Sequence, residues 1–111
     1  MDLKLQSRQE GDVTVVSASG EVDVFTAPGL DAELAAQLAD GHARLVVDLS
    51  DVSFLDSTGL GVLVKGLKGA REGDGFVRLV VTAERIRKIF DITGLDASMP
   101  LFDTVDDALA G

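Results

Sequence analysis

Residues 44–72 read RLVVDLSDVSFLDSTGLGVLVKGLKGARE and contain two neighbouring elements that decide the fold. Residues 44–49 form a short run rich in β-branched side chains, which is typical of a buried strand. From Asp56 onward, apolar residues recur at helical spacing while charged residues face away. The apolar positions are Leu60, Leu63, Val64, Leu67 and Ala70. The stretch therefore predicts a strand followed directly by an amphipathic helix.

The chain before this stretch predicts a hairpin and a first helix. Residues 2–9 and 13–18 are β-like runs separated by a Gly-Asp turn, a pattern that favours a hairpin with an antiparallel edge strand. Thr26 is a candidate N-cap, followed by an early proline and by leucines at every fourth position. An Asp-Gly pair at residues 40–41 is expected to end this helix.

The chain after it predicts two more strands and two more helices. Residues 76–81 are an apolar strand, and Thr82 is a candidate cap for a helix that ends at Gly94. Residues 103–109 form a plausible short final helix, with a short strand before it. The predicted order is β-β-α-β-α-β-α, followed by a short C-terminal strand and helix.

This alternation of strands and helices predicts an α/β fold, a mixed sheet that is mainly parallel, with an antiparallel N-terminal edge strand. In such a sheet, ligands bind at the rim formed by the carboxyl ends of the parallel strands. Three loops are expected on that rim, Ser19–Phe25, Ser53–Thr58 and Thr82–Glu84. The length predicts a single domain over residues 1–111.

Composition excludes several classes of function. The chain has 10 Lys and Arg against 19 Asp and Glu, a net charge of −9, which disfavours nucleic acid and anionic membranes as partners. It has no cysteine and one histidine, His42, so thiolate and multi-histidine metal sites are not expected. We expect a cytoplasmic protein, since no signal peptide or membrane span is apparent.

The residues at the start of the central helix admit two interpretations. Asp56 and Ser57 are both good N-cap types, and Gly59 and Gly61 leave the first turn bare, so backbone N–H groups could meet an anion or a partner. Alternatively, Ser57 is merely a cap and the two glycines allow close packing of the helix on the sheet. Spacing alone does not decide between these interpretations.

Residues 47–63 resemble the signature of the bacterial anti-sigma-factor antagonists, the small single-domain STAS proteins. Residues 20–27, with Gly-Glu-Val-Asp followed by Thr-Ala, resemble the first segment of that family, and residues 87–95 resemble its third. The similarity covers nearly the whole chain, from about residue 3 to 110, and it implies a mixed sheet of the STAS type. Many members carry a second serine where this chain has Thr58, which leaves Ser57 as the matching phosphoacceptor and Thr58 as a secondary one.

The resemblance implies partner switching. The unphosphorylated protein would bind an anti-sigma factor and so free a sigma factor. That partner, a serine kinase of the histidine-kinase-like ATPase type, would phosphorylate Ser57 and break the complex, and a serine phosphatase would reset it. ATP and Mg²⁺ would belong to the kinase, so this chain is expected to need no cofactor and to be no enzyme.

The implied partner-binding residues lie in two adjoining loops. They are Asp23, Asp56, Ser57, Thr58, Gly59, Leu60 and Gly61.

Two rival functions remain. An Asp56-nucleophile phosphotransferase would need more carboxylates and a cation-binding set around that residue, and the sequence does not supply them. A nucleotide- or small-ligand-sensing STAS module could use the same helix N-terminus, although the chain has no phosphate-loop signature.

Overall fold

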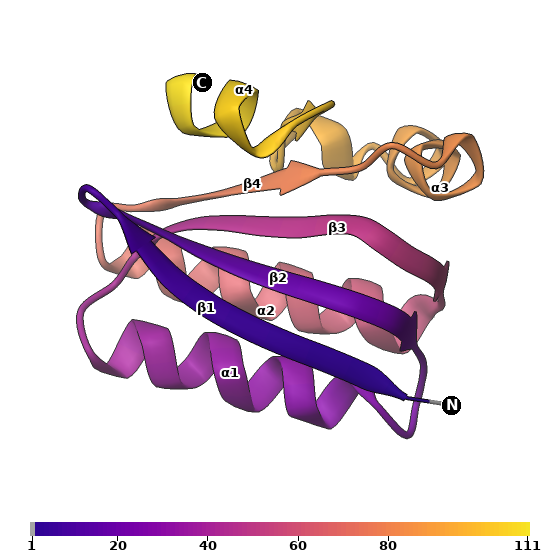
Figure 1. Cartoon of the computed structure of the whole chain (residues 1–111), viewed down its shortest axis with the longest axis horizontal. Coiled ribbons are helices and arrows are strands. Elements are labelled where there is room, and N and C mark those ends of the chain that lie inside the picture. The colour runs from indigo at the N-terminus through magenta and orange to yellow at the C-terminus, as the bar shows by residue number, and fades with distance from the viewer. Residues whose placement is uncertain (1) are drawn as a thin grey trace.

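A computed structural model describes residues 2–111 of the chain as one five-stranded sheet with its helices (Figure 1). The strand order is β1-β2-β3-β4-β5, with β1 antiparallel to β2 and every other neighbouring pair parallel. The strands are β1 (Leu3–Glu10), β2 (Val13–Val22), β3 (Arg44–Leu55), β4 (Phe76–Val80) and β5 (Leu101–Phe102). The helices are α1 (Ala27–Ala39), α2 (Ser57–Glu72), α3 (Glu84–Thr93) and α4 (Val105–Ala110), with the 3-10 turn η1 (Leu95–Ala97) after α3. The predicted fold class is confirmed.

The helices cover the two faces of the sheet unequally. Helices α1 and α2 lie side by side on one face and α4 lies on the other (Figure 1). Successive strand residues point to opposite faces. Val16 and Val47 therefore join the main core beneath α1 and α2, whereas Val15 and Val46 join a smaller cluster with Ala108 of α4.

Two strands run further than the sequence predicted, which shortens the rim loops. β2 continues to Val22 and β3 continues to Leu55, so the expected loop at residues 53–58 is reduced to Asp56 between strand and helix. The pairing of β2 with β3 shifts register twice in this stretch. These shifts explain why the sequence does not show a strand here, because an irregular register breaks the two-residue alternation on which the prediction depends.

The expected cap of α1 is confirmed in position, and that of α3 was wrong. Thr26 is the N-cap residue of α1, but its side chain makes no cap hydrogen bond: its hydroxyl donates to the carbonyl of Glu21 at 2.7 Å and accepts from the N–H of Asp23 at 2.9 Å. Helix α3 begins at Glu84 after Ala83, so Thr82 lies outside it. The final helix starts at Val105, two residues later than expected, with Thr104 as its cap.

Candidate functional site

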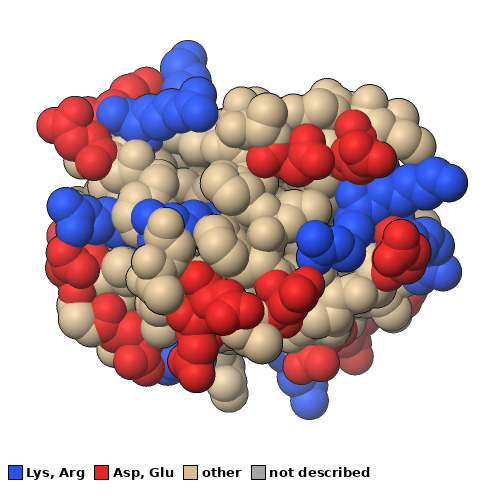
Figure 2. Space-filling view, turned by 90° about the horizontal axis from the view of Figure 1, so that it is seen from above, with Lys and Arg blue, Asp and Glu red and all other residues tan. Residues whose placement is uncertain are grey.

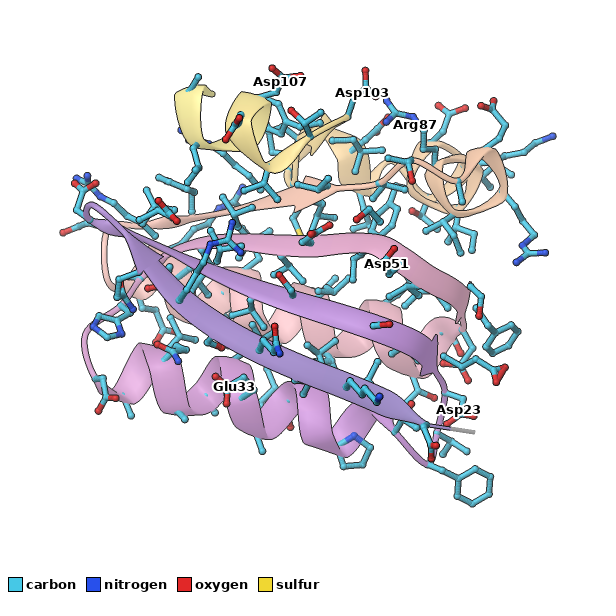
Figure 3. The ribbon with its side chains drawn as sticks, viewed as in Figure 1. Asp23, Glu33, Asp51, Arg87, Asp103 and Asp107 are labelled. Atoms are coloured by element: carbon cyan, nitrogen blue, oxygen red, sulfur yellow. The ribbon has the colours of Figure 1, made fainter. Side chains whose placement is uncertain are left out.

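The carboxyl ends of β2 and β3 meet at one rim of the sheet. Val22 pairs with Leu55, and the N–H of Asp56 donates to the carbonyl of Val22 at 3.2 Å. The loop after β2 (residues 23–26) therefore adjoins the start of α2, as the sequence predicted. Figure 3 labels Asp23 at this end of the molecule.

Asp56 is the N-cap of α2. Its Oδ1 accepts from the N–H groups of Thr58 at 3.0 Å and Gly59 at 3.1 Å, and its carbonyl accepts from the N–H of Leu60 at 3.1 Å. Ser57 is consequently the first residue of the helix rather than its cap, and it is exposed. Of the two candidate caps, only Asp56 has this role.

The same bonds change the expectation that backbone N–H groups at this terminus are accessible to an anion. The donors of Thr58 and Gly59 already serve the Asp56 carboxylate, and that of Leu60 serves its carbonyl. An incoming anion would compete with a fixed negative charge at the positive end of the helix dipole. For these three donors the prediction was wrong.

The two glycines of the motif differ in their surroundings. A Cβ on Gly59 would lie 2.5 Å from Leu55 Cδ1 and 2.7 Å from Val22 Cγ1, so this glycine allows α2 to pack closely on the sheet. Gly61 is exposed, with nothing within 4 Å of the corresponding position. The packing interpretation thus holds for Gly59 and not for Gly61, while Thr58 is exposed and Leu60 packs against the main core.

Asp23 organises the neighbouring loop. Its Oδ1 accepts from the N–H groups of Phe25 at 2.9 Å and Thr26 at 3.0 Å, and its own N–H donates to the Thr26 hydroxyl at 2.9 Å. The carbonyl of Asp23 accepts from the N–H of Ala27 at 2.8 Å. These bonds hold residues 23–27 in one conformation.

The Asp23 carboxylate is buried, with 5% of its surface exposed. Burial raises the pKa of this carboxyl, but the N–H groups of Thr26 and Phe25 and the Thr26 hydroxyl lower it, and the pKa lies below its ordinary value. Within residues 2–111, its second oxygen, Oδ2, has no hydrogen-bond partner. Asp23 is therefore a buried anion held by one of its two oxygens.

Exposed apolar side chains flank these aspartates. Val24 and Phe25, in the loop that Asp23 holds, are 57% and 84% exposed, and Phe54 at the end of β3 is 45% exposed. We call these three residues the rim patch. Their position at one rim makes them candidate contacts for a partner. The sequence analysis missed the rim patch, although an apolar Val-Phe pair within a predicted loop was a signal for it.

Helix α3 brings a basic residue to the same rim. The Arg85 guanidinium donates to the carbonyl of Ser53, which ties the first turn of α3 to the end of β3. The third expected rim loop leads directly into this turn, so the start of α3 contributes Arg85 to the site. Asp56 and Arg85 give this rim charges of both signs.

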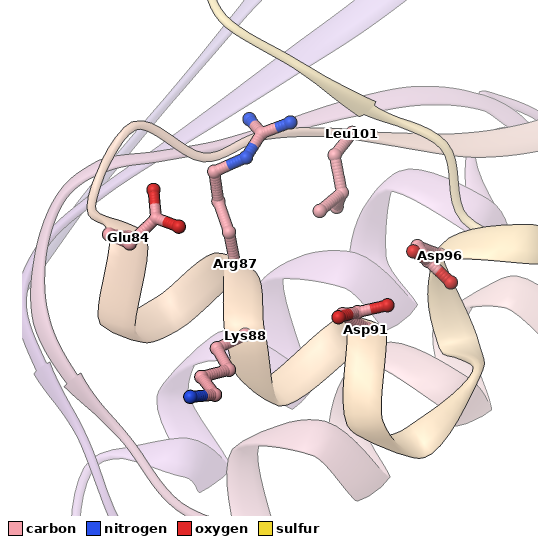
Figure 4. A pocket seen from close by; sticks show the side chains of 6 residues that line it. All are labelled: Glu84, Arg87, Lys88, Asp91, Asp96 and Leu101. Atoms are coloured by element: carbon pink, nitrogen blue, oxygen red, sulfur yellow. The ribbon is translucent and has the colours of Figure 1, made fainter.

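A shallow hollow of about 350 Å³ lies beside α3 (Figure 4). Its lining consists of Glu84, Arg87, Lys88, Asp91, Asp96 and Leu101. Arg87 is already bonded to the carbonyl of Val81 at 2.7 Å and to Asp103 at 3.2 Å. With mixed charges and its arginine already bonded, this hollow does not resemble a preformed anion site.

The surface charges, the metal-ligating side chains and the helices give three further facts. On the face seen from the α4 side, acidic and basic side chains are interspersed (Figure 2). Over residues 2–111, no cluster of three or more His, Asp or Glu side chains could hold a metal ion. No helix in the same range is both long and apolar enough to cross a membrane.

Comparisons by sequence show the relatives of the chain. The sequence model of the STAS domain matches residues 4–108. An anti-sigma-B factor antagonist of Staphylococcus epidermidis is 38% identical over 95 residues, which are 86% of this chain and 88% of the relative. The anti-sigma-B factor antagonist of Staphylococcus aureus (strain NCTC 8325 / PS 47) is 36% identical with the same coverage, 86% and 88%.

Comparisons by structure agree with them. The crystal structure of an anti-sigma factor antagonist from Mycobacterium paratuberculosis matches with a TM-score of 0.91 and 38% identity, over 98% of this chain and 92% of that chain. The Bacillus cell fate determinant SpoIIAA in its phosphorylated form matches with a TM-score of 0.76 over 96% of this chain and 97% of that chain. SpoIIAA is 21% identical, so this likeness shows the fold alone.

Proposed function

The chain belongs to the STAS domain family, and on that premise we propose that it is an anti-sigma factor antagonist that is switched by phosphorylation of Ser57. The unphosphorylated form binds an anti-sigma factor and so frees a sigma factor. A serine kinase of the histidine-kinase-like ATPase type, which is the anti-sigma factor itself, transfers a phosphate from ATP to the Ser57 hydroxyl, and a serine phosphatase removes it. This chain is substrate and ligand, and it contributes no catalytic group.

One observation carries the proposal. Ser57 is exposed on the first turn of α2, directly beside a loop that presents Val24 and Phe25 to solvent. A kinase can reach the hydroxyl without unfolding the domain, and a partner seated on the rim patch would cover it. We assign Asp23, Asp56, Thr58, Gly59, Leu60 and Gly61 to the partner-binding region. Thr58 and Gly61 are exposed, whereas Asp23 and Gly59 are buried and fix the backbone beneath the surface.

The charge of the phosphate explains the switch. Phosphorylation adds roughly −1.5 to −2 charges next to the Asp56 carboxylate. A partner carboxylate about 5 Å away would be repelled by about 3 kcal/mol per unit charge at an effective dielectric near 20, before screening by salt. That energy corresponds to a loss of affinity on the order of a hundredfold.

The first experiment identifies the acceptor. The protein is incubated with ATP, Mg²⁺ and the serine kinases of the organism that encodes it, purified one at a time, and the phosphate is located by mass spectrometry. We expect phosphate on Ser57 and none on the Ser57→Ala variant. A phosphate on Thr58 or Ser53 with Ser57 unmodified would contradict the proposal.

The second experiment measures the switch. Dissociation constants for the anti-sigma factor are compared for wild type, Ser57→Ala, Ser57→Asp and the phosphorylated form at two salt concentrations. We expect Ser57→Ala to bind as wild type does, the phosphorylated form to lose about a hundredfold, and Ser57→Asp, with one charge, to lose less. Equal affinity of the phosphorylated and unmodified forms would refute partner switching.

The fold is expected to survive the modification. Asp56 already caps α2, so the phosphate adds charge at an exposed position without replacing a bond of the folded state. The helix dipole favours an anion at this end, while Asp56 opposes it. Thermal melts should place the two forms within a few degrees of each other, and collapse of the folded state on phosphorylation would contradict a switch that acts at the surface.

The small-ligand alternative has less support. It requires free N–H donors at the start of α2, and those of Thr58, Gly59 and Leu60 are bonded to Asp56. The hollow beside α3 offers mixed charges rather than a basic cradle. Calorimetry with ATP, GTP and their diphosphates tests it, and micromolar binding by the isolated chain would favour the alternative.

A further inference from the structure

Helix α2 contains four glycines, and each destabilises a helix relative to alanine. Packing explains three of them. A Cβ would come within 2.5 Å of Leu55 at Gly59, within 3.1 Å of Leu34 at Gly66 and within 2.7 Å of Leu38 at Gly69. These glycines let α2 lie close to the sheet and to α1.

Gly61 has no such reason within the chain. A Cβ built on it meets nothing within 4 Å, the residue is exposed, and its φ is not in the left-handed region that favours glycine. Alanine would fit and would stabilise the helix. A glycine at an exposed helical position makes the helix less stable than alanine would. Because it has no side chain, it allows another molecule to approach the backbone closely.

Gly61 lies on a line of exposed residues along α2. Ser57, Gly61, Val64, Lys68 and Arg71 are spaced by four, three, four and three residues, which places them on one face of the helix. All five are exposed, including the apolar Val64 at 42%. We call this set the outer line of α2.

The charge at the far end of the outer line is opposite to that of the whole chain. The net charge is −9, yet Lys68 and Arg71 present two cations, and neither forms an ion pair within residues 2–111. Lys65 beside the line is bonded to Asp31 at 3.2 Å. Glu72 lines one hollow with Lys68 and Arg71, and Glu72 and Asp31 line a neighbouring hollow with Lys68, but neither carboxylate forms an ion pair with Lys68 or Arg71 in the described part of the chain. This end of α2 therefore suits an acidic surface, which most of the remaining surface would repel.

We propose that the outer line of α2 seats an acidic segment of the anti-sigma factor. The segment approaches the α2 backbone at Gly61, covers Val64 and sets carboxylates opposite Lys68 and Arg71. This inference rests on the proposed function and extends the contact from Ser57 over about 20 Å, the length of the next 14 residues of helix. An acidic partner surface along this line also accounts for repulsion by a phosphate on Ser57.

The sharpest test separates stability from binding at Gly61. In Gly61→Ala, the melting temperature should rise by roughly 3–5 °C, while affinity for the anti-sigma factor should fall about tenfold; in Gly61→Leu, affinity should fall further. Gly29→Ala is the matched control, because Gly29 is also in a helix, exposed, and free of neighbours within 4 Å of a Cβ. It should gain stability and bind as wild type does.

A second test addresses the charges. Lys68→Glu and Lys4→Glu each replace a cation with an anion, so both variants carry the same net charge, but only Lys68 is on the outer line. We expect the affinity of wild type for the anti-sigma factor to fall as the salt concentration rises. The affinity of Lys68→Glu should be about tenfold lower than that of wild type at low salt and should depend less on salt. The affinity of Lys4→Glu should stay within threefold of wild type. Equal losses in the two variants would show an effect of net charge and overturn the inference.

The outcomes distinguish this inference from the proposed function. If wild type binds none of the purified anti-sigma factors of its organism, the proposed function fails and this inference fails with it. If wild type binds and Gly61→Ala binds equally well, only this inference fails. If wild type self-associates in sedimentation experiments and Gly61→Leu abolishes that association, the outer line seats a second copy of the chain, and the acidic segment is wrong.

Discussion

Two aspartates at the ends of neighbouring strands make the same local bonds in different surroundings. Asp23 follows β2 and accepts from the N–H groups two and three residues ahead; Asp56 follows β3 and does the same. Asp23 is 5% exposed, and its carboxyl has a lowered pKa. Asp56 is only half-buried. Asp23 is therefore a buried residue that holds its loop, and Asp56 caps a helix at the surface.

The difference shows how one sequence signal yields two local environments. The loop that Asp23 holds presents apolar side chains, so its rigidity fixes the shape of the rim patch. The cap that Asp56 makes leaves Ser57 as the first helical residue, with its hydroxyl in solvent. Under the proposed function, Asp23 would position the docking surface and Asp56 would position the phosphoacceptor Ser57.

The largest effect is expected from removing the buried aspartate. Asp23→Ala removes a buried carboxylate oxygen and leaves the N–H groups of Phe25 and Thr26 without that acceptor, whereas Asp56→Ala removes the acceptor of Thr58, which is exposed and can bond to water instead. Asp56→Ala should cost about 1 kcal/mol of unfolding free energy, the usual value of an N-cap, and Asp23→Ala should cost more. Urea denaturation of both variants measures this, and equal losses would remove the distinction drawn from burial.

Lowering the pH should also reduce the unfolding free energy through Asp23, by less than the Asp23→Ala substitution does. Because the pKa of Asp23 is lower in the folded state than its ordinary value of 3.8, its charge stabilises the fold above about pH 4, and this contribution is lost as the pH falls through the folded-state pKa. Glu33 behaves likewise, since hydrogen bonds from Ser7 and Gln37 lower its pKa.

The measurement is the unfolding free energy between pH 6 and about pH 2. Wild type should lose stability below pH 4, and Asp23→Asn should lose less over the same range. Glu33→Gln serves as the control that removes the other lowered carboxyl. An unchanged pH profile in Asp23→Asn would contradict a stabilising charge at this position.

The sequence predicted the order of elements and the pairing of the two rim loops, because both follow from hydrophobic periodicity and parallel connection rules. It did not reveal which aspartate is buried. Asp23 and Asp56 both precede a helix and follow a strand, so local pattern treats them alike. Their burial depends on the neighbouring elements packed around each loop, which is a tertiary property.

The same limit applies to the glycines and to the rim patch. Gly59 and Gly61 are two residues apart in one helix and are equivalent by propensity, yet only Gly59 faces Leu55 and Val22. The exposure of Phe25 depends on the hydrogen bonds of Asp23, which hold the loop with that side chain outward. A sequence pattern predicts an apolar residue in a loop more readily than its direction.

The rim patch should matter for binding and little for folding. Phe25 is 84% exposed, so Phe25→Ala should leave unfolding free energy within about 0.5 kcal/mol of wild type. Affinity for the anti-sigma factor should fall about tenfold, or about 1.4 kcal/mol. Ile92→Ala is the matched control, because Ile92 is 74% exposed on α3 outside the rim patch. Equal effects in the two variants would deny the patch a specific role.

The smallest effect is expected from an amide at the exposed cap. Asn caps helices about as well as Asp, so Asp56→Asn should retain the bonds to Thr58 and Gly59 and change the unfolding free energy by only a few tenths of a kcal/mol. The variant also removes the negative charge beside Ser57. If Asp56 acts only as a cap, Asp56→Asn and wild type will have nearly equal unfolding free energies in urea denaturation. Ser57 will also be phosphorylated at a similar rate in the two proteins. Asp23→Asn should be the costlier of the pair, because its amide would place a buried donor where Oδ2 already lacks a partner. A loss in Asp56→Asn as large as that in Asp23→Asn would show that charge rather than burial separates the two aspartates.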